Sequence, residues 1–263
     1  MKRGASALQQ QYRDSGNFRK RSLLVGKFST NRYPWYRWVY DHFPTLDSGS
    51  AVLELGCGPG SLWKWNLDRI PRASTIVLSD FSAGMLRDSE RNLGADRSRF
   101  SFCQLDASLL PFRAASFDAV VANMMFYHVD DRPAALRDIR RVLRAHGRFY
   151  ATSTGREYMR ELNAAATRIL EIPPHTPSAE RFGLENGFEQ LQSVFAQVEV
   201  GRYQNELRVT EVQPLIDYFA SMEPLISPPP ERWAALREYF QRSINEQGAI
   251  VIPIDIGILI AHD

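Results

Sequence analysis

Two acids and three glycines are the residues of this 263-residue sequence best suited to chemistry. Glu54 precedes three glycines at alternate positions, Gly56, Gly58 and Gly60, and Asp80 lies twenty positions beyond the last of them. Alternate glycines let a small ligand lie against the main chain, because no Cβ holds it off. An acid that ends the second strand of a β–α–β unit is placed to bind a ribose diol. The spacing therefore predicts a nucleoside site.

The glycine spacing distinguishes two kinds of nucleotide site. Dinucleotide sites use Gly-x-Gly-x-x-Gly and hold a pyrophosphate at a helix N-terminus. Here the spacing is Gly-x-Gly-x-Gly, and the carboxylate of Glu54 would repel a pyrophosphate but attract an ammonium group. The segment ELGCGPG (54–60) resembles the first motif of the class I S-adenosylmethionine (SAM)-dependent methyltransferases, E/D-x-G-x-G-x-G. This resemblance implies SAM as cofactor and S-adenosyl-L-homocysteine as product.

Strands and helices alternate from about residue 50 to 154, and they must position these residues. Strands are expected within 51–55, 75–80, 99–107, 116–123 and 132–154, with crossover helices over 61–71 and 81–93. Ser82 is a plausible N-cap of the second helix. The alternation predicts an α/β fold, a Rossmann-like doubly wound sheet of seven mostly parallel strands. Ligands of such sheets bind beyond the carboxyl ends of the strands.

The resemblance continues at the later strand ends. In the family, positions equivalent to Phe81 and Met85 border the adenine ring, and a carboxylate like that of Asp106 accepts the adenine amine. The segment LPF…SFDAVVAN…YHV resembles the small-molecule branch, similar to ubiquinone and sterol methyltransferases. The resemblance and the strand ends together predict these cofactor-binding residues: Glu54, Gly56, Cys57, Gly58, Asp80, Phe81, Met85, Asp106, Ala107, Asn123 and Met124.

Methyl transfer from a sulfonium is an in-line displacement on an activated electrophile, so the protein mainly aligns the acceptor and excludes water. A base is needed only when the acceptor is protonated at neutral pH. His128, just past the fourth strand, is the best-placed candidate, with Tyr127 beside it. The alternative is a histidine that lines the cofactor or bonds backbone in the core. Candidate substrate-pocket residues are Tyr33, Tyr158 and His175.

Three parts of the chain are expected: an N-terminal helical lid (1–47), a SAM-binding core (48–155), and a segment (156–263) of helical cap insertions with the last strands. The first is rich in aromatic residues, and its stretch WYRWVYDHF has the periodicity of a helix packed on the sheet edge. A strand with a turn at Gly201 or a bulge is expected over 198–209, and a terminal strand over 249–263 is expected to close the sheet.

The composition is that of an ordinary soluble globular protein, 44% hydrophobic and 24% charged. The net charge of +2 gives no reason to expect a nucleic-acid partner. Two cysteines without a metal-binding pattern fit a reducing cytoplasm, and no metal site is expected. The N-terminus lacks the apolar region of a signal peptide, and the apolar run 249–261 is too short for a membrane span. Oligomeric state is left open.

The residues of the loop after the fourth strand bear on which class of molecule accepts the methyl group. Enzymes that methylate base amines carry an Asp/Asn-Pro-Pro-aromatic loop there, whereas this chain has NMMF, and neither cysteine follows a proline as a C5-pyrimidine nucleophile would. A small organic acceptor, metabolite or natural product, is therefore favoured. Two alternatives stay open: a SAM-fold protein that binds the cofactor without methyl transfer (cyclase, sensor or subunit), and methylation of protein or RNA.

Overall fold

The computed structural model describes residues 12–43, 49–171, 178–222 and 228–263, and these fall into two compact units. The sheet unit comprises Tyr33–Arg156, Pro177–Tyr203 and Ile256–Asp263. The helical unit comprises Met1–Arg32, Glu157–Thr176 and Gln204–Asp255. The segment expected as an N-terminal lid is thus divided between the units at residue 32, and the segment expected as a cap contributes to both.

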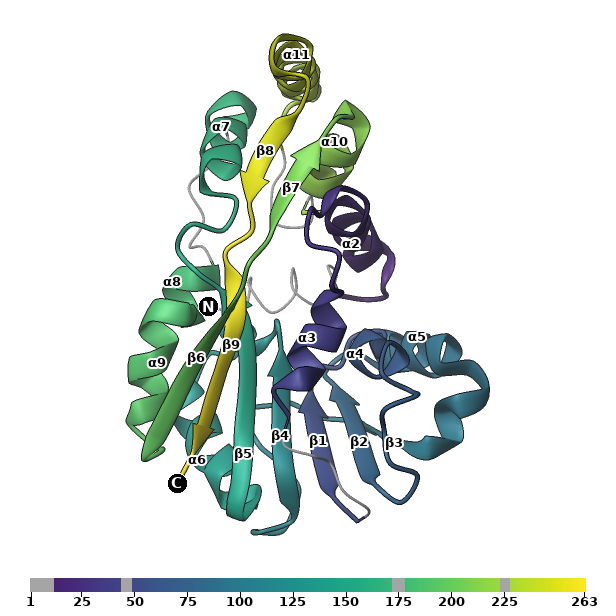
Figure 1. The fold of residues 1–263 in the computed structure, drawn as a ribbon, viewed down its shortest axis with the longest axis vertical. Coiled ribbons are helices and arrows are strands. Elements are labelled where there is room, and N and C mark those ends of the chain that lie inside the picture. Colours follow the sequence, from purple (N-terminus) through teal and green to yellow (C-terminus); the bar gives the residue numbers. More distant parts are fainter. Residues whose placement is uncertain (1–11, 44–48, 172–177, 223–227) are drawn as a thin grey trace. The chain divides into compact units, whose positions relative to one another are not determined.

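The sheet unit is built on seven strands in the order β3-β2-β1-β4-β5-β9-β6 (Figure 1). Their bounds are β1 Ala51–Leu55, β2 Thr75–Asp80, β3 Phe100–Gln104, β4 Phe117–Asn123, β5 Leu143–Thr154, β6 Gln197–Tyr203 and β9 Ile256–His262. The first five run parallel, and β9 is antiparallel to both β5 and β6. The predicted Rossmann-like sheet of seven mostly parallel strands is confirmed.

Both faces of this sheet are covered, which is why its central strands are apolar throughout. Neighbouring residues of β1 point to opposite faces, and Val52 and Leu53 accordingly belong to two different core clusters. The helices and 3-10 turns of the unit are α3 Trp35–Asp41, α4 Ser61–Lys64, α5 Ala83–Leu93, η1 Gly94–Arg99, η2 Phe126–His128, α6 Arg132–Val142, α8 Ser178–Phe182 and α9 Leu184–Gln192.

Helix α3 packs against the edge strand β6, as its periodicity predicts. The rings of Trp35 and Trp38 stack with centroids 5.4 Å apart, and Tyr203 of β6 meets both of them edge-on. A Cβ at Gly201 of β6 would lie 3.2 Å from the ring of His42, so the glycine lets the segment approach the strand closely.

The first crossover helix is shorter than expected, and the prediction of a helix over 61–71 is wrong. Helix α4 ends at Lys64 and turns follow. Asn66 lies where the helix would continue, and its side-chain amide donates to the carbonyl oxygens of Leu62 and Tyr36. Such side-chain bonds to the backbone compete with helix propagation.

The N-cap of α5 is confirmed, because Ser82 Oγ accepts from Met85 N at 3.2 Å.

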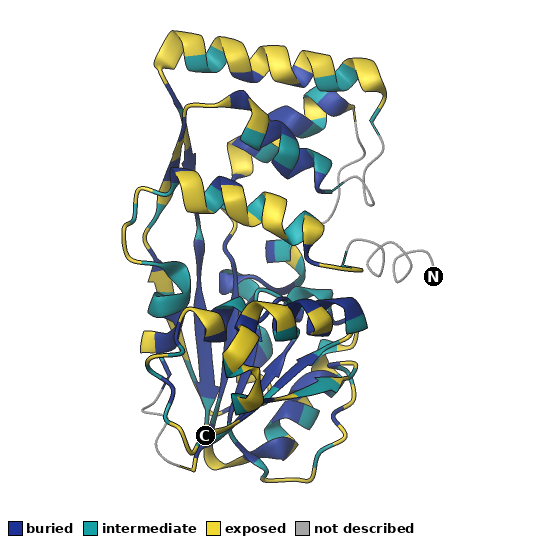
Figure 2. Cartoon of the chain, turned by 90° about the vertical axis from the view of Figure 1, so that its right-hand side faces the viewer, coloured by how far each residue is buried: buried dark blue, intermediate teal, exposed yellow. Residues whose placement is uncertain are grey.

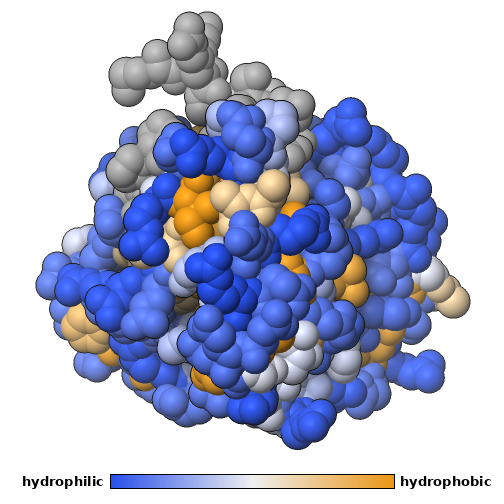
Figure 3. Space-filling model, turned by 90° about the horizontal axis from the view of Figure 1, so that it is seen from above, coloured by the Kyte–Doolittle hydropathy of each residue, from blue (hydrophilic) through white to orange (hydrophobic). Residues whose placement is uncertain are grey.

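The helical unit contains four helices and a two-stranded antiparallel sheet among the residues that the structure describes. They are α2 Gly16–Phe28, α7 Arg160–Leu170, α10 Val212–Ala220, α11 Pro230–Gln247, β7 Glu206–Val209 and β8 Ile250–Pro253. Most of α11 is exposed, and only Leu236 and Phe240 of it are buried (Figure 2). From above the surface is mostly hydrophilic with scattered hydrophobic spots (Figure 3).

Two strand predictions need correction. The strand expected over 198–209 is divided into β6 and β7, and the terminal strand expected over 249–263 is divided into β8 and β9. At both breaks the chain leaves the seven-stranded sheet: β7 and β8 pair with each other, and Leu207 of β7 also forms an isolated antiparallel bridge with Ser29. Pro253 ends β8, where a proline cannot donate to a ladder, and Ile254 N bonds Asn205 O instead. Apolar periodicity alone does not reveal which sheet a strand joins.

Candidate functional site

The glycine turn between β1 and α4 has the left-handed backbone that its sequence requires. Gly56, Gly58 and Gly60 have φ of +63°, +53° and +71°. The turn is held on β2 because Cys57 N donates to Ser79 O at 2.8 Å. A Cβ at Gly60 would lie 2.4 Å from the Ser89 hydroxyl, whereas a Cβ at Gly58 would meet no atom within 4 Å. Gly58 therefore presents bare main chain to open space.

Asp80 ends β2 and joins the glycine turn to the start of α5. Its Oδ2 accepts from Gly58 N at 2.9 Å and its Oδ1 accepts from Ser82 N at 2.8 Å. Burial raises the pKa of this carboxyl, and backbone N–H groups of Ser82, Gly58 and Phe81 oppose the rise. A carboxylate has about four acceptor positions, so these bonds leave capacity for a diol.

Glu54 lies inside the unit beside the turn, and its exposed fraction is 1%. Its Oε2 accepts from the indole Nε1 of Trp63 at 2.6 Å. The pKa of Glu54 is raised to about 8, chiefly by burial; the bond from Trp63 lowers it in part and the negative charge of Asp80 contributes to the rise. Burial also raises the pKa of the Cys57 thiol well above its ordinary value, with the charges of Glu54 and Asp80 adding to the rise.

The electrostatic surroundings of Glu54 and Asp80 are alike in one respect. No cationic side chain of the described residues contributes to the pKa of either Glu54 or Asp80. A buried acid beside a half-buried one, without a counter-cation, is costly to ionise, and a bound cation would relieve that cost. The turn thus combines an open main-chain surface with two acids whose ionised forms a positively charged ligand would favour.

The other residues expected near an adenine ring differ in exposure. Phe81 is 51% exposed and Asp106 is also exposed, whereas Met85 and Ala107 are buried at 2% and 9%. The carbonyl of Phe81 accepts from Gln104 Nε2 at 3.0 Å, and Asp106 Oδ1 accepts from Ser108 N at 2.8 Å. These bonds hold the loops after β2 and β3, and the Phe81 ring and the Asp106 carboxylate both stay accessible to a ligand.

The end of β4 is tied to β5 through one hydroxyl. Thr152 Oγ1 donates to Asn123 Oδ1 at 2.7 Å and accepts from Met124 N at 2.9 Å. Met124 has φ of +53°, an uncommon backbone for a residue that is not glycine. Strained residues of this kind persist where the surroundings hold them, often at ligand sites. Residues 123 and 124 therefore end the strand in a fixed geometry.

The two catalytic candidates occupy the 3-10 turn η2, directly after that strand end. The rings of Tyr127 and His128 lie 4.6 Å apart and tilted, and both residues are half-buried. His128 N donates to Met125 O at 2.8 Å, which fixes the backbone of the turn. The turn places both side chains beyond the carboxyl edge of the sheet, on the loop that follows β4.

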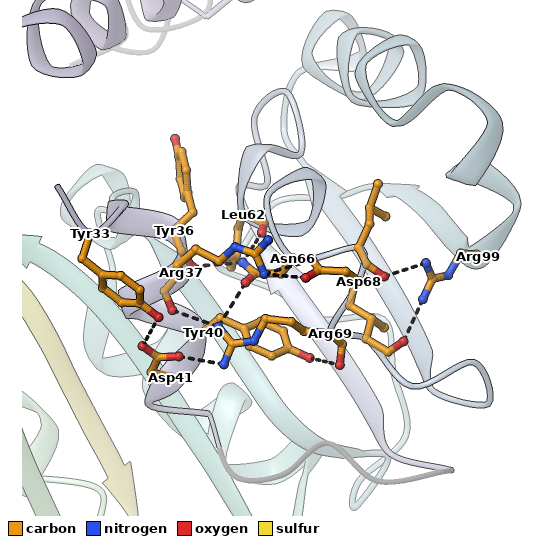
Figure 4. Close-up of polar contacts among 12 residues, drawn as sticks. Tyr33, Tyr36, Arg37, Tyr40, Asp41, Leu62, Asn66, Asp68, Arg69 and Arg99 are labelled. Carbon is orange, nitrogen blue, oxygen red and sulfur yellow. Dashed lines mark hydrogen bonds and ion pairs between the residues drawn. The ribbon is translucent and has the colours of Figure 1, made fainter.

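The three candidate substrate residues belong to different parts of the chain, Tyr33 to the sheet unit and Tyr158 to the helical unit. The Tyr33 hydroxyl donates to Asp41 Oδ2 at 2.7 Å, at the outer side of α3 (Figure 4). In the helical unit, the carbonyl oxygen of Tyr158 accepts from Asn163 Nδ2 at 3.5 Å. His175 lies outside the described residues.

Tyr36 of α3 is a residue to which the sequence analysis gave no role. Its carbonyl oxygen accepts from Asn66 Nδ2 at 3.0 Å, which joins α3 to the loop after α4. The pKa of Tyr36 is raised to about 12, chiefly by burial, with the charge of Glu54 contributing to the rise. The signal was the helical spacing of WYRWVYDHF, in which Tyr36 and the buried Tyr40 are four residues apart on one face.

Two features, a membrane-spanning helix and a metal-binding cluster, are absent from the described residues. None of the helices in residues 12–43, 49–171, 178–222 and 228–263 is long and apolar enough to cross a membrane. The same part of the chain holds no group of three or more His, Cys, Asp or Glu side chains arranged to bind a metal ion.

Residues 53–151 match the family model described as a methyltransferase domain. The chain is 29% identical over 147 residues to the malonyl-[acyl-carrier protein] O-methyltransferase of Enterobacter lignolyticus, covering 56% of each. It is 38% identical over 102 residues to the ubiquinone/menaquinone biosynthesis C-methyltransferase UbiE of Xanthomonas oryzae pv. oryzae, covering 38% of this chain and 40% of that protein. The chain thus spans about half the length of the curated relatives it matches.

Among solved structures, the chain resembles phosphoethanolamine N-methyltransferase 2 of Haemonchus contortus, determined with phosphomonomethylethanolamine and S-adenosylhomocysteine. The TM-score is 0.59 at 16% identity, over 98% of this chain and 59% of that one. At this identity the likeness establishes a shared fold. The part of the chain that matches the family model holds the glycine turn, Asp80 and the end of β4.

Proposed function

We propose that this chain, whose residues 53–151 match a methyltransferase domain, is a class I SAM-dependent methyltransferase that transfers the methyl group of SAM to a small organic acceptor. One observation carries the proposal. The turn at Gly58 is open main chain beside Asp80 and the buried Glu54, with no cationic side chain of the described residues acting on either acid. SAM brings the ammonium and sulfonium charges that this environment lacks.

The residues of the turn fit SAM in distinct roles. Gly58 would let the cofactor lie on the main chain, and the free acceptor positions of Asp80 would receive the ribose hydroxyls. The exposed ring of Phe81 and the carboxylate of Asp106 would face the adenine. When bound, SAM supplies a methyl group already activated by its sulfonium. The protein therefore has to orient the acceptor and exclude water.

Calorimetric titration with SAM and with S-adenosylhomocysteine tests this function. Wild type is expected to bind both in the micromolar range, with the product at least as tight. Asp80→Ala is expected to weaken SAM binding by about 1–3 kcal/mol, because charged hydrogen bonds to the ribose and to the turn are lost. Binding is measured as a dissociation constant, followed by a screen of small acceptors for methyl transfer.

Asp118→Ala is the matched control for Asp80. Like Asp80, Asp118 accepts a hydrogen bond from a backbone N–H group, that of Ala51 in β1, at 2.8 Å. Asp118, however, lies at the amino end of the parallel strands. Its removal is expected to leave SAM affinity within twofold of wild type. No binding of either ligand to wild type would refute the proposed function, and equal losses in the two variants would refute only the ribose assignment.

His128 is proposed as the base for acceptors that are protonated at neutral pH. His128→Ala is then expected to lower kcat by roughly 100-fold or more, since positioned general bases contribute about that much, with little change in the SAM dissociation constant. Single-turnover methyl transfer and calorimetry measure the two quantities. His146→Ala, at an exposed position of β5, serves as control and is expected to change neither. Parallel loss of turnover and affinity would make His128 a cofactor contact.

A small acceptor is favoured over a macromolecule by the loop after β4. This loop, NMMFY (123–127), is largely apolar, and its aromatic ring Phe126 is fully buried. The named relatives are enzymes of malonyl-[acyl-carrier protein] O-methylation and of ubiquinone and menaquinone biosynthesis. The two free cysteines, Cys57 and Cys103, fit a reducing compartment.

A further inference from the structure

Strand β4 lies between β1 and β5 and ends at an amide side chain, that of Asn123 (Figure 1). In the register of β1 with β4, Glu54 pairs with Val121, so Asn123 lies two residues nearer the carboxyl end of the sheet. Side chains two residues apart on a strand point to the same face, and therefore Asn123 shares a face with Glu54. From the usual strand spacing and rise, their Cα atoms are about 8 Å apart. A donor group and a buried acid thus adjoin beside the glycine turn.

Thr152 of β5 determines which way round the amide of Asn123 is held. It pairs with Asn123 in the register of β4 with β5, and its side chain is fully buried. Its hydroxyl accepts from Met124 N at 2.9 Å and donates its single proton to Asn123 Oδ1 at 2.7 Å. With the amide reversed, that proton would find no acceptor among the residues that the structure describes. Oδ1 therefore faces Thr152, and Nδ2 faces away from it.

The Nδ2 group of Asn123 keeps both of its hydrogens for a ligand. No residue in the described part of the chain accepts from it, and Asn123 is half-buried, so the group is not sealed in the core. It lies at the carboxyl end of a parallel strand, where ligands of such sheets bind. An amide NH2 group donates two hydrogen bonds and accepts none, so its partner is an oxygen with lone pairs and not an ammonium or amine N–H.

We propose that Asn123 binds the carboxylate at the amino-acid end of SAM, and that Thr152 is the positioning residue that directs the amide donor toward it. This end of SAM carries an ammonium and a carboxylate on one carbon atom, so it requires an anion and a donor on the same side. Glu54, when ionised, supplies the anion, and Asn123 supplies the donor on the same face of the sheet. The inference rests on the proposed function and adds to it a preference for a cofactor that retains its carboxylate.

S-adenosylhomocysteine and its decarboxylated analogue differ only in the carboxylate, so they test the role of Asn123 as a pair of probes. Wild type is expected to bind S-adenosylhomocysteine roughly 10- to 100-fold more tightly, the usual effect of hydrogen bonds to a charged group. Asn123→Asp replaces the donor by an anion that repels a carboxylate, although it can still accept from Thr152. The variant is expected to lose the preference. Calorimetry measures the four dissociation constants, and the ratio within each protein cancels general damage to the fold.

Three outcomes of this experiment would count against a claim. Equal binding of the two probes by wild type, or the same preference in wild type and Asn123→Asp, would overturn the assignment. A retained preference together with a raised KM for a methyl acceptor would also overturn it, because the amide would then bind an oxygen of the acceptor. Wild type that binds neither probe would refute the proposed function instead.

Thr152→Val and Thr152→Ser form a matched pair that tests the positioning role. Valine has the shape of threonine without its hydroxyl, so the amide of Asn123 loses its fixed orientation. Met124 N keeps a bond to the backbone carbonyl of residue 152 at 3.2 Å, so the end of β4 stays attached. Thr152→Val is expected to reduce the preference for the carboxylate several-fold, whereas Thr152→Ser, which retains the hydroxyl, keeps it. An unchanged preference in the valine variant would overturn the positioning role, and thermal unfolding reports its stability separately.

Discussion

Gly58→Ala is expected to weaken SAM binding by roughly 10- to 100-fold while the protein stays folded. The new methyl group meets no protein atom within 4 Å, so it would occupy the space in which the ligand lies on the main chain. Intruding carbon atoms in packed sites cost about 1–3 kcal/mol, which corresponds to that loss of affinity. The backbone at φ +53° adds a stability cost of about 1–2 kcal/mol. Calorimetry measures the affinity, and thermal unfolding measures the stability.

Gly60→Ala is the matched control, because it imposes the same side chain on a similar left-handed backbone. Its methyl group would lie 2.4 Å from Ser89 Oγ, so the main effect is expected on stability. Ser89→Ala in the same chain removes that clash and should restore part of the lost melting temperature. Wild-type affinity in Gly58→Ala would show that the ligand does not lie on Gly58.

Glu54→Gln is expected to become progressively more stable relative to wild type as the pH rises from 5 to 8. In the folded protein Glu54 keeps its proton up to about pH 8, whereas in the unfolded chain it ionises near its ordinary value of 4.5. Between these values the folded state binds more protons, so the stability of wild type falls as the pH rises, by on the order of 1 kcal/mol per pH unit. Above pH 8 this fall ends.

The glutamine variant removes this titration and can still accept the hydrogen bond from Trp63 Nε1. Urea unfolding of both proteins at several pH values measures the difference, which should reach a plateau above pH 8. A difference that does not depend on pH would contradict a protonated Glu54. The same acid should couple to the ligand, since a cation favours its ionised form. SAM binding at pH 7 should therefore release a proton from wild type and less from Glu54→Gln, detected by calorimetry in buffers of different ionisation enthalpy.

Local signals in the sequence determined much of the fold. The buried strand AVVA of β4, the N-cap at Ser82 and the repeated β–α alternation each follow from short-range patterns, and the structure confirms the sheet they predict. The errors arose where a long-range partner decided the outcome. Helix α4 ends early because the amide of Asn66 bonds the carbonyl of Tyr36, thirty residues earlier in the chain. Strands β7 and β8 leave the main sheet to pair with each other.

For the candidate site too, some features followed from the sequence and others depended on the tertiary structure. Residue types and spacing alone placed Glu54, the glycines and Asp80 at strand ends, because parallel strands present their carboxyl ends at one edge. Only the tertiary structure decided that Glu54 is buried against Trp63, that Gly58 faces open space while Gly60 packs on Ser89, and that Asn66 joins the carbonyl of Tyr36 to the loop after α4. Motif spacing is a property of the chain, whereas burial, a raised pKa and the approach of a distant helix depend on which elements pack together in three dimensions.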